Sequence, residues 1–422
     1  MLFVGIVCQP NAARAQSAAP VAEEADTLDS HDAEPNKNKD PEAVSNTDAT
    51  QNAWDSTAAD DWDTDTGEVD RKPHISGVMQ ASFRAAFFAV DAQGIRKPDS
   101  NTFQLEHNHV KLSGDITHEL SWEIMPCLTH MNTFSVVTAN FAYAFGSALH
   151  LVAGRFLLPF GQFNARSLPG TYNTVSRPLL YLSHEDGIAE FEGITASPFF
   201  FTPRDDLGLQ ANGSVWFGGS HFQLSYAASV TNGLRPESPT MARFWNDNNK
   251  AKQVAGRATL GLFAGPFSIT AGGSGLWNQY HEALGQTALG GDVEIQLTYA
   301  EGRSAAIRGE VVRMDREVIP NEKLLKGRET IQSAYGTFEI DLTSWLAMYY
   351  ELDWLEETTP DVNAALVPYY KSKSVMRHTG GVGIRFAEAV VLRLEYGYWQ
   401  VHDTLGAVHI AHLLSAQTVL TF

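Results

Sequence analysis

The chain has 422 residues, 49 acidic against 30 basic side chains, a formal net charge of −19 and two cysteines. So few cysteines exclude a disulfide framework and a four-ligand zinc site, and the acidity argues against binding to nucleic-acid phosphates. Hydrophobic residues at 44% and aromatic residues at 11% supply enough apolar surface for most of the chain to fold. The mean hydropathy of −0.19 argues against a bundle of membrane helices, but not against a membrane barrel, whose outward and inward residues average out.

The first 72 residues differ in composition from the rest. An apolar run at 2–8 is followed by Ala13-Arg14-Ala15, which has the small-x-small form of a secretory cleavage site, so we expect a signal peptide at 1–15. Residues 1–72 contain 16 acidic and five basic residues, and 16–72 show almost no aliphatic periodicity. Such a segment cannot bury enough apolar surface to offset its ordering entropy. We therefore expect 16–72 to be a disordered acidic tether in the periplasm and 73–422 to be the folded domain.

From His74 onward the hydrophobic period is two. In 346–354 the large apolar and aromatic side chains alternate with Ala347, Tyr349, Glu351 and Asp353. The same alternation recurs in segments at 222–230, 292–299 and 392–398. Each segment is predicted to be a β-strand with one apolar face and one face that accepts charges.

The connections between these strands indicate how the sheet closes. We predict sixteen strands, near 74–90, 102–114, 117–127, 136–146, 148–157, 205–216, 221–231, 252–263, 266–276, 289–300, 304–315, 330–342, 345–356, 374–386, 389–402 and 407–422. Short turns alternate with longer loops, near 91–101, 128–135, 158–204, 232–251, 277–288, 316–329, 357–373 and 403–406. Short turns at one end, long loops at the other and an even strand number are typical of a barrel in the bacterial outer membrane.

The predicted fold is therefore all-β, a transmembrane antiparallel barrel of sixteen or eighteen strands surrounded by outer-membrane lipid. The final strand is amphipathic and the chain stops at Phe422, which resembles the signal that hands such barrels to their assembly machinery.

Motifs between residues 150 and 235 carry a resemblance to a family. Gly154-Arg155-Phe156 is followed by Pro159-Phe160-Gly161 and then by Arg177-Pro178-Leu179; further on come 204–209 and 230–233. This pattern resembles the phosphate-selective porin O/P family of Gram-negative bacteria. The resemblance implies a homotrimer and a third loop, 158–204, that folds into the barrel and narrows it. A loop of this length also needs a function or a packing site on general grounds.

The strand parity predicts which charged side chains line the pore. The predicted acidic residues are Glu123, Asp292, Glu294, Glu310, Glu339, Asp341, Glu351, Asp353 and Glu395. The predicted basic residues are Arg84, Lys111, Arg155, Arg257, Arg308, Arg385 and Arg393, with Arg166 and Arg177 on the constriction loop. Nine acids against seven wall bases predict only weak charge selectivity, so the resemblance does not extend to phosphate selectivity.

Two arrangements of these charges are compatible with the sequence. Most of the acids fall on the tenth to thirteenth strands, opposite several of the bases, which predicts a transverse field across the lumen. The alternative is that these are ordinary solvated charges balanced by ion pairing.

No other group of residues indicates chemistry. His107 and His109 share a face with Lys111, but two imidazoles without a nearby cysteine or carboxylate make a weak metal site, so we expect polar lumen histidines and no metal or cofactor. Cys127 is the only thiol left once the signal peptide is removed.

The predicted function is that of a porin, which is not an enzyme and gives small hydrophilic or ionic solutes a passive route. One alternative is a non-conducting barrel with an adhesive or envelope-structural role. A second is an outer-membrane hydrolase.

Overall fold

The computed structural model describes residues 72–89, 99–128, 135–168, 170–182, 205–219, 221–233, 251–281, 284–318, 327–362, 368–404 and 406–422. The predicted signal peptide at 1–15 and the predicted tether at 16–72, apart from Lys72, lie outside the described residues.

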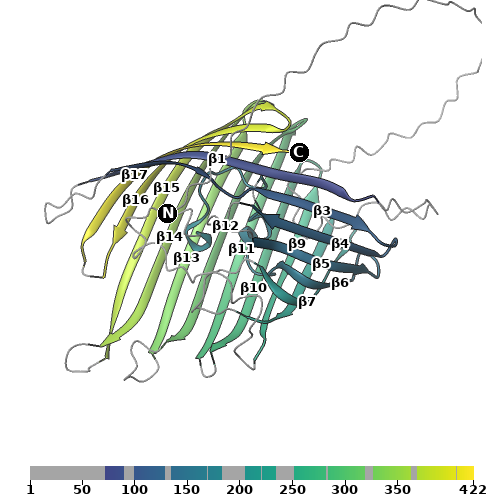
Figure 1. Cartoon of the computed structure of the whole chain (residues 1–422), viewed down its shortest axis with the longest axis horizontal. Helices are drawn as coiled ribbons and strands as arrows, with labels where there is room; N and C mark the ends of the chain where they lie inside the picture. Colours follow the sequence, from purple (N-terminus) through teal and green to yellow (C-terminus); the bar gives the residue numbers. More distant parts are fainter. Residues whose placement is uncertain are drawn as a thin grey trace, which may run out of the picture. The chain divides into compact units, whose positions relative to one another are not determined.

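The described chain is almost entirely β-strand (Figure 1). The strands are β1 His74–Phe88, β2 Ser100–Leu105, β3 His109–Asp115, β4 Leu120–Cys127, β5 Ser135–Ala144, β6 His150–Leu157, β7 Asp205–Phe217, β8 Phe222–Thr231, β9 Gln253–Ala264, β10 Phe267–His281, β11 Leu284–Ala300, β12 Arg303–Val318, β13 Gly327–Asp341, β14 Leu346–Val362, β15 Pro368–Ala387, β16 Val390–His402 and β17 Val408–Thr421. Two short helices, α1 Gln162–Ala165 and η2 Leu179–Tyr181, interrupt the connection between β6 and β7.

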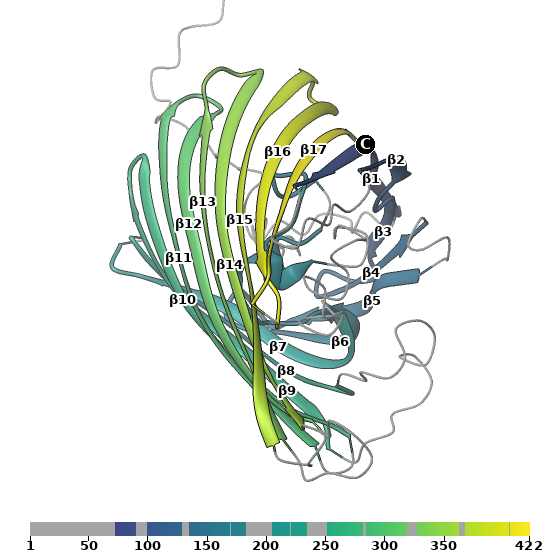
Figure 2. The ribbon, with the colours of Figure 1, turned by 90° about the vertical axis from the view of Figure 1, so that its left-hand side faces the viewer.

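The sheet closes on itself. Apart from β2 and β3, each strand pairs antiparallel with its sequence neighbours, and β17 pairs with β1 from Val78↔Thr421 to Phe88↔Ala411. The segments β2 and β3 both pair with β1 and therefore occupy one position in the sheet. The result is the predicted closed antiparallel barrel, with sixteen strand positions. Figure 2 shows the long strands β10–β15 side by side, with the shorter β3–β6 in the opposite wall.

The structure corrects the sequence prediction at several strand ends. The predicted single strand 102–114 is wrong, because residues 106–108 interrupt it between β2 and β3. The predicted loop 277–288 is also wrong, because β10 and β11 pair as far as His281↔Leu284. In the same way β14 and β15 pair as far as Val362↔Pro368, within the predicted loop 357–373. Beyond the bilayer the outer face of a strand need not be apolar, so the hydrophobic alternation stops while the hydrogen-bond ladder continues.

The two faces of the barrel differ in chemistry. Outward residues include Leu289, Ile307 and Leu394, and all three are exposed apolar side chains. Inward residues include Glu310 and Arg393, which are buried charges. A closed sheet leaves no unpaired edge, and an apolar outer face is compatible with hydrocarbon, so this arrangement places the barrel in the outer membrane, as the sequence predicted. Among the described residues, no helix combines the length and the apolar character needed to cross a membrane.

Candidate functional site

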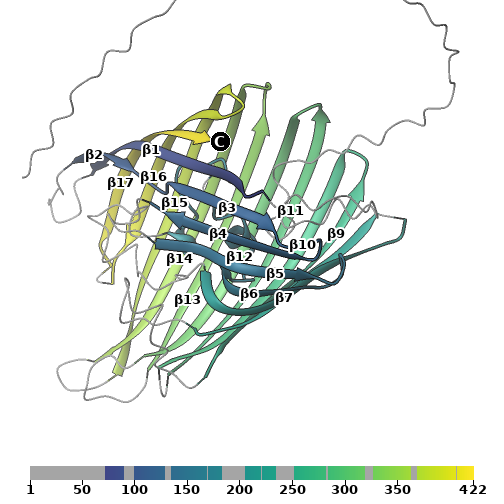
Figure 3. The ribbon, with the colours of Figure 1, turned by 45° about the vertical axis from the view of Figure 1, so that its right-hand side comes forward.

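The described part of the third loop lies inside the barrel. We call residues 158–168 and 170–182 the inner loop; they include α1 and η2. Leu158, Phe160, Leu179 and Leu180 are each at most 2% exposed, and the last three belong to a hydrophobic cluster with inward side chains of the wall. Figure 3 shows the barrel from a side on which the short strands lie in front of this region. The inner loop is therefore a packed internal element of the barrel.

The Pro-Phe-Gly motif forms the turn that brings the inner loop onto the wall. Gly161 has a φ of 74°, in the left-handed region that favours glycine. A Cβ atom there would collide with the Tyr181 hydroxyl and the Glu310 carboxylate. The Gly161 N–H donates to Ser274 Oγ on β10 at 2.9 Å. Glycine is thus required twice at this position, for its backbone angle and for the close approach to the wall.

Glu310 on β12 is one anchor of the inner loop. Its Oε2 accepts hydrogen bonds from the Phe163 N–H and from the Tyr335 hydroxyl, both at 3.1 Å, and its Oε1 accepts one from the Tyr181 hydroxyl. Burial, followed by the Glu310 carboxylate, raises the pKa of the Tyr181 hydroxyl well above its usual range, so this group stays a donor. Three donors on one buried carboxylate offset the cost of removing it from water.

Glu395 on β16 is a second anchor. Its Oε2 accepts from the Val175 N–H at 2.8 Å and its Oε1 from Ser176 Oγ at 2.6 Å. The Tyr349 hydroxyl donates to the same carboxylate at 3.1 Å. Asp353 on β14 adds a contact to η2, since it accepts from the Leu179 N–H at 3.3 Å. Carboxylates on separate strands therefore hold the two halves of the inner loop.

A cluster of charges around Arg308 joins the inner loop to β11 and β13. The Arg308 guanidinium pairs with Glu294 and with Glu339, each at 2.8 Å. The inner loop binds the same two acids, because Gln162 Nε2 donates to Glu294 at 2.8 Å and Asn173 Nδ2 donates to Glu339 at 2.7 Å.

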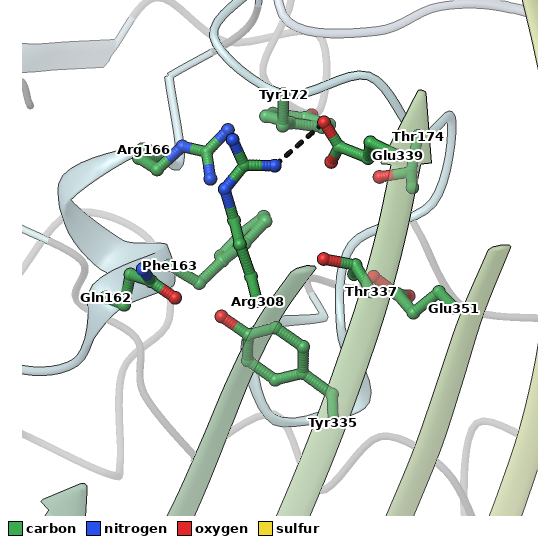
Figure 4. A pocket seen from close by; sticks show the side chains of 10 residues that line it. All are labelled: Gln162, Phe163, Arg166, Tyr172, Thr174, Arg308, Tyr335, Thr337, Glu339 and Glu351. Carbon is green, nitrogen blue, oxygen red and sulfur yellow. Dashed lines mark ion pairs between the residues drawn. The ribbon is translucent and has the colours of Figure 1, made fainter. Parts of the chain in front are cut away.

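Arg166 lies next to this cluster. Figure 4 shows the guanidiniums of Arg166 and Arg308 side by side, with Glu339 facing them, around a pocket of about 320 Å³. Burial, and then the charge of Arg308, lowers the pKa of Arg166.

Arg377 on β15 was not among the predicted residues, although it is the most completely buried charge in this region. It is 0% exposed and pairs with Glu351 at 2.6 Å and with Asp353 at 2.5 Å. Its Nη2 also donates to the carbonyl of Arg177 at 2.6 Å. Arg377 thus contacts two predicted acids, Glu351 and Asp353, and one predicted loop residue, Arg177. It has the same strand parity as Arg385, which was predicted to face the pore.

The remaining predicted charges lie in local pairs along the wall. These pairs are Lys111–Glu123 at 2.6 Å, Arg385–Asp341 at 3.0 Å, Arg257–Asp292, Arg84–Glu106 at 2.7 Å and Arg155–Asp205. Glu106, which lies in the break between β2 and β3, and Asp205, the first residue of β7, were not among the predicted residues. Apart from Arg393, the predicted bases on the wall opposite the acidic strands therefore have carboxylate partners of their own.

Arg393 and Arg177 are held by dipoles and aromatic rings. Arg393 Nη1 donates to the Thr174 carbonyl at 3.3 Å and to Gln417 Oε1 at 3.1 Å, and its guanidinium lies 5.8 Å from the centre of the Tyr172 ring. Arg177 Nε donates to the Tyr172 hydroxyl at 3.4 Å. Arg393 thus joins β16 to the inner loop, and the Arg177–Tyr172 hydrogen bond lies within the inner loop.

A larger cavity lies on the other side of the inner loop. It has an empty volume of about 770 Å³, part of it open to solvent. Its walls come from β6–β11, and only Gln162 of the inner loop borders it. The lining is polar and includes His150, Asn212, Arg257 and Glu294. The hydrogen-bonded anchors of the inner loop therefore lie on β10–β16, whereas the cavity is bordered mainly by β6–β9 and meets the anchoring strands only at β10 and β11.

Comparison with known proteins gives a fold but not a family. No family model matches the sequence, and no curated protein matches it. Solved structures that share the fold include three outer-membrane proteins. An anion-selective porin from Comamonas acidovorans has a TM-score of 0.52 at 10% identity, over 83% of this chain and 99% of that chain. The outer membrane channel DcaP of Acinetobacter baumannii has a TM-score of 0.52 at 10% identity, over 83% and 97%. Pseudomonas putida OprB has a TM-score of 0.51 at 8% identity, over 84% and 95%.

The chain therefore shares the sixteen-stranded fold of outer-membrane porins and channels. The narrower resemblance to the phosphate-selective porin O/P family stays a prediction from its motifs.

Proposed function

We propose that the protein is an outer-membrane porin that lets small hydrophilic or ionic solutes diffuse passively through a water-filled barrel. The observation that carries this proposal is the asymmetric position of the inner loop. It is anchored on β10–β16, while the polar cavity borders β6–β11. A loop whose hydrogen bonds lie mainly on one wall narrows the barrel and leaves a polar route beside β6–β9.

The narrowest part of the proposed route lies where the inner loop meets the cavity. Gln162, Arg257 and Glu294 all line the cavity there. The loop proposed as the constriction is 158–204, of which the inner loop is the described part. The solute in this account is small and polar, because the lining offers hydrogen bonds and both signs of charge.

The ion pairs along the wall support weak charge selectivity. Local pairing cancels most of the field that segregated acids and bases would produce, since paired charges act as short dipoles. Of the two predicted charge arrangements, local ion pairing is the one we propose. We further propose that the protein is a trimer, that the assembly machinery recognises Phe422, and that the chain is divided into signal peptide, tether and barrel. Light scattering of the detergent-solubilised protein tests the trimeric state.

Planar-bilayer recording tests the proposed function. We expect the purified chain to give nanosiemens-scale steps in KCl and a reversal potential close to zero under a salt gradient. Thr259 lines the cavity, whereas the next residue on β9, Leu260, is half-exposed on the outer face. A Thr259→Trp substitution should reduce the conductance and Leu260→Trp should leave it unchanged. Equal conductance for the two variants would contradict the proposed route.

The alternative function is a non-conducting barrel with an adhesive or envelope-structural role. The extent of burial inside the barrel favours it, since the inner loop packs tightly against the inward residues of β12–β16. Bilayers that stay silent with correctly folded protein would establish this alternative.

A further inference from the structure

Three metal-ligating side chains meet where β2 gives way to β3. His107 lies in the break between these strands, and His109 is the first residue of β3. In the antiparallel ladder, His109 stands directly opposite Cys127, the last residue of β4. One ring nitrogen from each histidine and the Cys127 Sγ all lie within 4.8 Å of one another. The expectation that the two histidines have no cysteine nearby is therefore wrong.

The cluster is buried in a largely apolar setting. His107, His109 and Cys127 are 1%, 2% and 1% exposed. Cys127 packs with Met125, Val137 and Leu157, and Leu168 of the inner loop lies against the same group. A site so enclosed protects a thiolate ligand from solvent and from oxidants.

A buried amide on the adjoining strand is a second, independent feature of the place. The backbone carbonyl of Gln80 on β1 accepts a hydrogen bond from the Glu106 N–H at 3.0 Å, and the backbone N–H of Gln80 donates one to Asn108 Oδ1 at 2.7 Å. Gln80 is therefore bonded to both ends of the segment that carries His107. Its side-chain amide is 1% exposed and has no hydrogen-bond partner among the described residues. A buried amide in this state normally indicates a missing partner such as a bound water.

We propose that His107, His109 and Cys127 bind a transition-metal ion, with Zn²⁺ as the ion that suits them best. Two imidazoles and one thiolate are borderline-to-soft ligands, which favour Zn²⁺ over Mg²⁺ or Ca²⁺. With Zn–N and Zn–S bonds of about 2.0 and 2.3 Å, tetrahedral ligands lie roughly 3.3–3.6 Å apart. Side-chain rotations that bring the three atoms closer by about 1 Å would complete the site.

Three protein ligands leave one tetrahedral position for water. The buried amide of Gln80, on the neighbouring strand, gives this water a hydrogen-bond partner. The ion would join β4 to the segment at 106–108, where the regular ladder is interrupted. The ion would thus cross-link this part of the barrel wall, which is formed by the short strands.

Cobalt titration of the full-length, EDTA-treated protein folded in detergent tests the site. Co²⁺ bound by a thiolate gives a charge-transfer band in the near ultraviolet, and tetrahedral Co²⁺ gives strong visible bands. We expect both in the wild type at one ion per chain, with displacement by Zn²⁺ and no effect of Ca²⁺. His109→Ala should weaken binding by roughly tenfold or more, since even partners outside the ligand shell are worth 10–100-fold.

The full-length chain used in this titration still contains the predicted signal peptide, so its second cysteine, Cys8, offers a matched control. Cys8→Ser removes a thiol elsewhere and should keep the cobalt–thiolate band, whereas Cys127→Ser should lose it. Zn²⁺ should also raise the unfolding temperature of wild type and of Cys8→Ser but not of Cys127→Ser. Absence of the band from the folded wild type overturns the proposal without any variant. A band that survives in Cys127→Ser and disappears in Cys8→Ser overturns it as well.

Discussion

Replacing Glu310 by alanine should loosen the inner loop at both of its ends, near Phe163 and near Tyr181. The carboxylate accepts hydrogen bonds from the Phe163 N–H and the Tyr181 hydroxyl, both of which belong to the inner loop. A hydrogen bond to a buried charge is worth about 1.5–3 kcal/mol, so the two together hold the loop by at least about 3 kcal/mol. That energy corresponds to a rise of about 100-fold in the population in which both of these contacts are undocked. Glu395 still holds the middle of the inner loop at Val175 and Ser176.

Single-channel recording in planar bilayers measures the effect. We expect Glu310→Ala to show a larger mean conductance and more frequent current fluctuations than the wild type. Asp341→Ala is the matched control, because Asp341 is an acid paired with Arg385 for which no contact with the inner loop is found among the described residues. If the two variants gave the same current records, the proposed anchoring of the loop would be refuted. Heat-dependent migration on gels shows that each variant is folded.

Three further predictions test the charges and the outer face. Arg257→Ala leaves the negative charge of Asp292 without its partner beside the cavity, so the reversal potential under a KCl gradient should shift toward cation preference, and an unchanged value would count against the proposed route. Arg377→Ala leaves two buried carboxylates uncompensated, so urea denaturation should show a free energy of unfolding about 3–5 kcal/mol lower than that of the wild type. The more exposed Arg385→Ala should lower it by at most about 1 kcal/mol, and equal losses for the two variants would contradict this. Ile307 lies about 12 Å from the nearest turn along the barrel axis, at a strand rise of about 3.3 Å and a tilt of about 40°. Ile307→Arg should therefore lower the free energy of unfolding in lipid vesicles by about 2–4 kcal/mol, and Glu301→Arg in that turn should lower it by only about 0–1 kcal/mol.

The sequence predicts the barrel well because its signal is local. Alternation between an apolar and a polar face fixes the parity of each strand, and all sixteen strand positions are found near the predicted places. Strand ends above the bilayer are predicted poorly, as at 277–288, because the alternation that marks a strand is imposed by the lipid.

The partners of the inward charges depend on tertiary structure and could not be predicted. Phe163 and Glu310 are 147 positions apart, and no pattern in the sequence links them. Arg377 could have been found from strand parity alone. Glu106 could not, because the break at 106–108 changes which side chains face inward.

The cysteine partner of His109 was missed for a geometric reason. The predicted strands 102–114 and 117–127 leave only residues 115–116 for the turn, whereas β3 and β4 are joined by residues 116–119. In a hairpin the position of the turn sets every cross-strand pair, and a small shift changes each partner. With the observed turn, His109 stands opposite Cys127.

The anchoring of the inner loop also has a consequence for biogenesis. The loop precedes all of its anchoring strands in the chain, and its contacts span from 113 residues at Ser274 to 220 residues at Glu395. Contacts of such long range form only after the intervening segments have been ordered. The interior is therefore completed last, once β16 is in place, and an immature barrel is wider and wetter than the finished protein.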